Sequence, residues 1–106
     1  MFNKQHFIDF MVQSKVLIFG DFITKSGRET PYFINTGNYT NGEQLQTLGK
    51  FYASAVAENF GSQVTNLFGP AYKGIPICSS AAINLCQTHK MNVTFSFDRK
   101  EIKAAK

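Results

Sequence analysis

The stretch of this sequence best suited to chemistry is "GPAYKGIP", Gly69–Pro76, which directly follows the apolar run Val64–Phe68. Lys73 places a positive charge between two glycines, where a buried strand is expected to pass into a helix. Backbone amides at such a point bind anions, and Gly69 and Gly74 carry no side chain that would keep a ligand away. The stretch therefore indicates a phosphate-binding turn. The alternative is an ordinary helix start whose lysine points to water, because the spacing matches neither a Walker loop nor a dinucleotide fingerprint.

Two further loops carry basic side chains beside aromatic ones. The segment Thr24–Phe33, "TKSGRETPYF", presents Lys25 and Arg28 just before two aromatic residues. The segment "FDRKEIK" follows a predicted strand and presents three cations, Arg99, Lys100 and Lys103. Together with the Lys73 turn, these loops favour a ligand that is both polyanionic and flat.

Composition bounds the class of protein. The 106 residues are enough for one domain, and a hydrophobic share of 43% argues against disorder. The net charge is +4, from 11 basic and 7 acidic residues, and Arg99–Lys106 alone holds four basic residues and one acidic residue. A basic tail of this kind attracts phosphate, nucleic acid or an anionic membrane, or forms a solvated helix face.

The sequence predicts an intracellular, cytoplasmic protein without a membrane partner. Its N-terminus lacks the uninterrupted apolar stretch of a signal peptide, and the longest uncharged run, Gly74–His89, is too short to span a bilayer. Cys78 and Cys86 lie eight positions apart in one predicted helix, which separates their Cα atoms by roughly 12 Å. That separation rules out a disulfide between them, and reduced thiols suit the cytosol.

The first half of the chain predicts a helix, two strands and a second helix. Phe2–Lys15 has apolar residues at helical spacing, and the β-branched and aromatic segments 16–27 and 30–37 read as strands bounded by Gly and Pro. Asn41 and Gln44 have the spacing of a capping box. The helix that they open is expected to end at Gly61, where a left-handed residue is favoured.

The second half predicts one βαβ unit. Val64–Phe68 resembles a strand that a parallel sheet buries on both faces, Ile75–His89 a helix, and Asn92–Phe97 the next strand. Two central strands are too few for a doubly wound sheet, which usually has about five or six. We therefore expect the chain to be a fragment of a larger domain.

Three motifs, in this order and at these separations, identify a family. "LIFGDFITKSGRETPYFINTG", "LFGPAYKGIPI" and "FDRKEIK" closely resemble the N-terminal half of orotate phosphoribosyltransferase, a type I phosphoribosyltransferase. The resemblance runs from about Met11 to Lys103. It implies an α/β fold in which helices flank a parallel sheet, with an N-terminal hood region. Residues 1–106 would be the N-terminal part of one domain: helix and hood strands to about residue 40, then the start of the βαβ core. The C-terminal half of the fold would be absent.

The resemblance implies a transferase of pyrimidine (UMP) biosynthesis. Such a glycosyltransferase moves ribose 5-phosphate from 5-phosphoribosyl diphosphate to N1 of orotate, with Mg²⁺, and releases diphosphate and orotidine 5′-monophosphate. In the family, a mobile loop reaches across a homodimer interface, so each active site is shared. No Asp or Glu of this chain has the placement of a Mg²⁺ cage, so we assign no metal ligand and expect substrate oxygens and water to hold the ion.

The resemblance also assigns roles to individual residues. Tyr72 and Lys73 would lie in the diphosphate-binding loop, and Phe33 and Ile34 match the pair that lines the orotate pocket. The full set implied for the phosphoribosyl diphosphate site is Lys25, Tyr72, Lys73, Arg99, Lys100 and Lys103, of which Lys73 and Lys103 are the catalytic candidates.

This sequence departs from the family pattern in three places. Many relatives have a second Phe at the position of Ile34, so stacking there is weaker. The family's loop continues past the position of Lys103 with a His and a Gly-Glu-Gly stretch, whereas Ala105 occupies the His position here. The acidic pair and Thr-Ala-Gly-Thr loop that bind the ribose phosphate would lie beyond Lys106. We therefore expect the 106 residues to be inactive alone.

Two other classes of function compete with the enzyme. A small basic module for RNA or single-stranded nucleic acid would suit a high isoelectric point and exposed aromatic residues, but the positive charge sits at strand ends rather than along a face. A non-catalytic dimerisation fragment is the other alternative. His6 and His89 lack partners at ligand spacing, so neither indicates a metal site.

Overall fold

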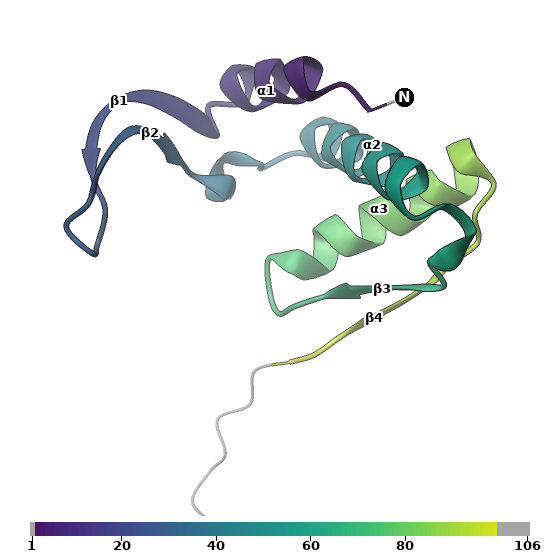
Figure 1. Ribbon diagram of the computed structural model, residues 1–106. Helices are drawn as coiled ribbons and strands as arrows, with labels where there is room; N and C mark the ends of the chain where they lie inside the picture. Colours follow the sequence, from purple (N-terminus) through teal and green to yellow (C-terminus); the bar gives the residue numbers. More distant parts are fainter. Residues whose placement is uncertain (1, 100–106) are drawn as a thin grey trace, which may run out of the picture. The chain divides into compact units, whose positions relative to one another are not determined.

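The computed structural model describes residues 2–99 (Figure 1). In chain order the elements are α1 (Lys4–Gln13), β1 (Leu17–Ile23), β2 (Glu29–Ile34), a 3₁₀ turn (Thr36–Asn38), α2 (Gly42–Asn59), a second 3₁₀ turn (Gly61–Gln63), β3 (Asn66–Gly69), α3 (Gly74–His89) and β4 (Thr94–Phe97). The chain divides into two compact units. The hairpin unit comprises Asn3–Gln44, and the crossover unit comprises Phe2 with the residues from Leu45 onward.

The hairpin unit begins with the predicted amphipathic helix. Asn3 caps α1 because its side-chain oxygen accepts a hydrogen bond from the backbone N–H of His6, 3.0 Å away. Lys15, with a left-handed φ of 60°, turns the chain from α1 into β1. The Asn38 side-chain amide donates to the Lys15 carbonyl at 2.7 Å, which ties the segment after β2 to this turn.

The two predicted strands form an antiparallel hairpin (Figure 1). Leu17 pairs with Ile34 at its base, and the register shifts between Phe19 and Phe22, which marks a β-bulge. Gly20 lies in the bulge with a φ of 155°. Most hairpin side chains on both faces are exposed, so little of the core lies here.

The helix predicted from Asn41 begins as its capping box requires. The backbone N–H of Gln44 donates to Asn41 Oδ1 at 2.8 Å, and the backbone N–H of Asn41 donates back to Gln44 Oε1 at 3.3 Å. Gly61 follows α2 with a left-handed φ of 54°, which confirms the predicted stop.

The core of the crossover unit lies between α2 and α3. Leu48 and Ala53 of α2 and Leu85 of α3 are almost fully buried. Gly49 allows the close approach, because a Cβ atom there would lie 2.0 Å from Ser80 Oγ. The Ser80 hydroxyl in turn donates to the Leu45 carbonyl at 2.8 Å. Small residues at this contact therefore let the two helices pack closely.

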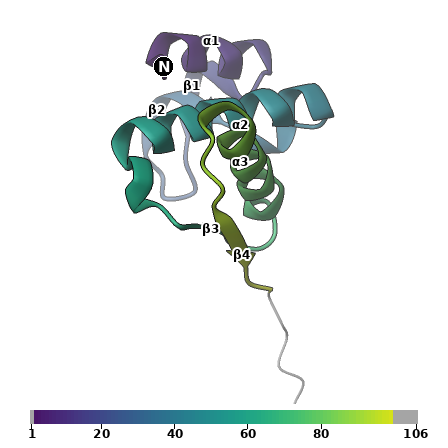
Figure 2. The same cartoon turned by 90° about the vertical axis from the view of Figure 1, so that its right-hand side faces the viewer.

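The predicted βαβ unit is present, with β3 and β4 paired in parallel through α3 (Figures 1 and 2). The strand starts at Asn66 rather than Val64, and α3 lies against the pair. The expectation that β3 would be buried on both faces is wrong, since Phe68 is 58% exposed. In the neighbouring β4, Phe95 and Phe97 are likewise 51% and 56% exposed. The physical reason is that β3 and β4 are the only strands of this sheet in residues 2–99, so each has an unpaired edge, and a single helix such as α3 covers one face of a sheet and not both.

Candidate functional site

The candidate site is built on the turn between β3 and α3, Gly69–Gly74. A Cβ atom at Gly69 would lie 2.6 Å from the Gly74 carbonyl oxygen and 2.7 Å from Cys78 Cβ. A Cβ atom at Gly74 would lie 2.7 Å from Pro70 Cδ. The sequence suggested that these glycines leave room for a ligand, but here they leave room for the protein itself. They fold the turn tightly onto the first turn of α3.

The folded turn buries one residue and presents the next two. Ala71 is 9% exposed, whereas Tyr72 is 59% exposed and Lys73 is also at the surface. The peptide bond between Ala71 and Tyr72 is cis. Lys73 occupies the N-cap position of α3, and no side chain in the described part of the chain caps that end. At this end the backbone N–H groups of Gly74 and Ile75 donate to the carbonyls of Pro70 and Tyr72, at 3.1 and 3.2 Å. Pro76 has no backbone N–H, so the charge that the turn offers to an anion is that of the Lys73 side chain.

The connection that leaves β4 joins this turn. The two strands run parallel, and their last register pair is Gly69 with Phe97, so both chains leave the sheet at the same edge. Just past this pair, Asp98 Oδ1 accepts a hydrogen bond from the backbone N–H of Ala71 at 2.7 Å. Arg99 follows and is exposed. The structure thereby brings three of the predicted site residues, Tyr72, Lys73 and Arg99, to one sheet edge.

Asp98 is a site residue that the sequence analysis missed. It stands in the quoted "FDRKEIK" motif, directly before Arg99. One signal could have found it. An Asp directly after a parallel strand can accept from the neighbouring strand's outgoing turn, because both leave the sheet side by side.

The remaining predicted residues within the described range belong to the hairpin unit. Lys25 is exposed in the loop between β1 and β2, which is closed by the Thr24 backbone N–H donating to the Arg28 carbonyl at 2.9 Å. Phe33 and Ile34 are each 48% exposed on β2. Successive strand residues point to opposite faces, so these two side chains lie on opposite faces of the hairpin. Phe33 contacts Phe22, with ring centroids 5.7 Å apart.

Lys100 and Lys103, like Ala105, lie outside the described residues. Their predicted roles remain predictions from the sequence.

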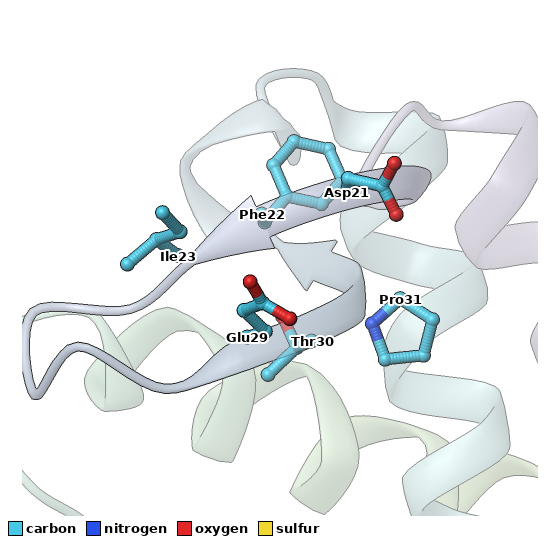
Figure 3. A pocket seen from close by; sticks show the side chains of 6 residues that line it. All are labelled: Asp21, Phe22, Ile23, Glu29, Thr30 and Pro31. Carbon is cyan, nitrogen blue, oxygen red and sulfur yellow. The ribbon is translucent and has the colours of Figure 1, made fainter.

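Two hollows accompany these elements. On the hairpin, a hollow of about 550 Å³ is lined by Asp21, Phe22, Ile23, Glu29, Thr30 and Pro31 (Figure 3). Figure 3 shows its two carboxylates on paired strands, Asp21 from β1 and Glu29 from β2. Two negative charges repel a diphosphate, so this hollow is a poor candidate for the anion site. In the crossover unit, a hollow of about 330 Å³ adjoins the turn and is lined mostly by apolar side chains.

Cys78 lines the second hollow together with Tyr52 and Phe68. Burial raises the pKa of the Cys78 thiol above its ordinary value, because the apolar surroundings disfavour the thiolate. Cys78 and Cys86 are both free thiols on α3, as their spacing predicted.

Within residues 2–99, no three His, Cys, Asp or Glu side chains gather closely enough to hold a metal ion. None of the helices described is long and apolar enough to cross a membrane.

Comparison with solved structures identifies the fold. A crystal structure of orotate phosphoribosyltransferase from Francisella tularensis superposes with a TM-score of 0.81, at 41% identity, over 90% of this chain and 46% of that one. Adenine phosphoribosyl transferase from Trypanosoma brucei shares the fold, with a TM-score of 0.51 at 23% identity. The fold is thus that of the phosphoribosyltransferases, an α/β fold with helices flanking a parallel sheet, as the motifs predicted.

Sequence comparison finds relatives that share one name. The chain is 59% identical over 100 residues to orotate phosphoribosyltransferase of Clostridium acetobutylicum and 53% identical to that of Clostridium beijerinckii. Each match covers 94% of this chain but 45% of the relative, so the chain spans somewhat less than half of their length. No family model matches the chain. The resemblance to the N-terminal half of the orotate phosphoribosyltransferases is thereby confirmed.

Proposed function

We propose that the protein carrying this chain is an orotate phosphoribosyltransferase. It transfers ribose 5-phosphate from 5-phosphoribosyl diphosphate to orotate, giving orotidine 5′-monophosphate and diphosphate in pyrimidine biosynthesis. Relatives that are 59% and 53% identical over 100 residues carry this name. The single observation that carries the proposal is structural. The exposed Lys73 and Arg99 leave one sheet edge together, on connections joined by the Ala71–Asp98 hydrogen bond.

This edge suits a departing diphosphate. As the bond between the anomeric carbon and the diphosphate oxygen breaks, both electrons leave with the diphosphate, and the sugar gains oxocarbenium character. The N1 atom of orotate forms the new bond to the anomeric carbon, and its proton passes to solvent water. Lys73 is proposed to stabilise the growing negative charge, and Arg99 and Tyr72 to bind the same group. Lys100 and Lys103 extend this proposed cationic set, with Lys103 as a second catalytic group.

Lys25, Phe33 and Ile34 are proposed to bind substrate from the hairpin unit. Lys25 adds a cation for the diphosphate, and Phe33 offers a half-exposed ring for the flat face of orotate. Since Phe33 and Ile34 point to opposite faces, a single orotate would meet the side chain of Phe33 and the backbone of Ile34.

Mg²⁺, when bound with the diphosphate, supplies charge neutralisation for the leaving group. We assign no metal ligand within this chain and propose that substrate oxygens and water hold the ion. We further propose a cytoplasmic homodimer with shared active sites. The two free thiols support the cytoplasmic location.

The test is turnover by the full-length protein. With orotate, 5-phosphoribosyl diphosphate and Mg²⁺, orotate should be consumed and one orotidine 5′-monophosphate and one diphosphate should appear for each. Free diphosphate should inhibit in competition with 5-phosphoribosyl diphosphate. An absence of turnover, with steeply salt-dependent binding of single-stranded RNA instead, would overturn the proposal in favour of a nucleic-acid-binding module.

A further inference from the structure

We infer that Asp98 is a positioning residue for the turn that carries Lys73. Its carboxylate fixes the Ala71 backbone and thereby sets where the next two residues, Tyr72 and Lys73, project. The hydrogen bond itself is a feature of the fold, whereas its consequence for catalysis rests on the proposed function.

The hydrogen bond from Ala71 to Asp98 takes the place of a backbone hydrogen bond that Pro70 cannot donate to the sheet. Beyond the last register pair of β3 and β4, the next residue on the β3 side is Pro70, which has no backbone N–H. The parallel ladder cannot continue from that residue. The next available donor is the backbone N–H of Ala71, and Asp98 Oδ1 accepts from it at 2.7 Å. The side chain therefore extends the connection between the two chains past the end of the backbone ladder.

The location of Ala71 makes this contact matter. Ala71 is 9% exposed, so water has little access to satisfy its amide if the carboxylate is removed. Ala71 also lies between the tightly packed Gly69 and the exposed pair Tyr72 and Lys73. A shift of its backbone would carry Lys73 with it, and small displacements of a group that stabilises a transition state are costly.

Asp98 fixes the turn as a hydrogen-bond acceptor, and its negative charge is not needed for this. The Asp98 carboxylate directly precedes Arg99, and its partner Ala71 lies two residues before Lys73. A negative charge so close to both cations opposes the binding of an anion at this edge. Asparagine keeps an acceptor oxygen of the same reach without the negative charge. We therefore expect Asp98→Asn to keep the geometry of the turn, and Asp98→Ala to lose it.

The experiment uses the full-length protein with two readouts. The first is hydrogen exchange of the peptide that contains Ala71, measured without substrate. Asp98→Ala should lose protection there, Asp98→Asn should keep it, and the control Asp9→Ala on α1 should leave it unchanged. The second is steady-state kinetics. Asp98→Ala should lower kcat/KM for 5-phosphoribosyl diphosphate by at least about tenfold. Asp98→Asn should stay within about threefold of wild type, with an equal or lower KM for that substrate.

The outcomes separate the two proposals. Wild-type protection of Ala71 in Asp98→Ala overturns the positioning role. Equal loss of protection in Asp98→Asn and Asp98→Ala overturns the claim that an uncharged acceptor is sufficient. If the wild-type protein lacks turnover but Ala71 exchanges as expected, the proposed function fails and the role of Asp98 in fixing the turn stands. Should Asp98→Ala not fold, Asp98→Glu replaces it. Its carboxylate is displaced by one methylene and should lower both protection and kcat/KM, and wild-type values of both would overturn the inference.

Discussion

The backbone N–H of Ala71 and the carboxylate of Asp98 lie 2.7 Å apart, although 27 positions separate the two residues in the sequence. The contact joins the turn after β3 to the residue after β4. It brings the exposed side chains of Lys73 and Arg99 to the same edge of the parallel pair. The cationic edge is thus a product of strand topology and of one side-chain acceptor.

Replacing Lys73 tests the electrostatic role of the turn. Lys73→Ala should lower kcat/KM for 5-phosphoribosyl diphosphate by at least about tenfold, because a charge that stabilises the departing diphosphate is lost. Steady-state kinetics of the full-length protein measure this, with the exposed Lys50→Ala on α2 as the matched control. Unchanged turnover in Lys73→Ala would remove this lysine from the mechanism.

Replacing Phe33 tests which hairpin face meets orotate. Loss of a base-stacking ring costs about 1–3 kcal/mol, so Phe33→Ala should raise the KM for orotate by roughly 5-fold to 150-fold. Tyr32→Ala, which removes a ring from the opposite face, should change that KM little. The prediction fails if the Tyr32 variant is the more impaired of the two.

Replacing Gly49 tests the packing of α2 on α3. A Cβ atom there would lie 2.0 Å from Ser80 Oγ and 2.8 Å from the Ser80 backbone carbon, and backbone cannot move aside cheaply. Gly49→Ala should therefore lower the free energy of unfolding by about 1–3 kcal/mol. Gly42→Ala, where a Cβ atom meets nothing within 4 Å, is the control and should be neutral or slightly stabilising. Urea denaturation of both variants decides, and equal midpoints would contradict the packing described.

The two cysteines should differ in reactivity. Because burial raises the pKa of the Cys78 thiol, less thiolate forms at a given pH, and Cys86 is exposed. Iodoacetamide at pH 8 should label Cys86 first, as read by mass spectrometry of peptides. Faster labelling of Cys78 would contradict the assignment.

The raised pKa of Cys78 also makes the free energy of unfolding depend on pH. Below the ordinary thiol pKa of 9.0, both folded and unfolded chains keep the proton. Above it, the unfolded chain loses the proton more readily than the folded one, so stability falls as pH rises. Cys78→Ala should remove part of that decline, measured by urea denaturation at pH 8 and pH 10.

Local signals predicted the elements well. The Asn41–Gln44 spacing and the position of Gly61 defined both ends of α2, since caps depend on residues only a few positions apart. The β3 strand was placed two residues early, because Val64 and Thr65 have strand-like side chains but lie before the first paired residue.

Non-local relationships were predicted less well. The exposure of Phe68 could not be foreseen, because an apolar run shows that a strand could be covered but not whether anything covers it. The turn glycines also differ from expectation, because they make room for protein atoms and not for a ligand. What fills the space beside Gly69 is Cys78, nine residues further along the chain, and such contacts are fixed by tertiary packing.

The tight folding of the Gly69–Gly74 turn has a consequence for protein engineering. A mutant library aimed at ligand affinity can randomise Tyr72 and Lys73, whose side chains stand outside the packed body. Gly69 and Gly74 should be held constant, because any larger residue there would collide with neighbouring atoms before selection could act on binding.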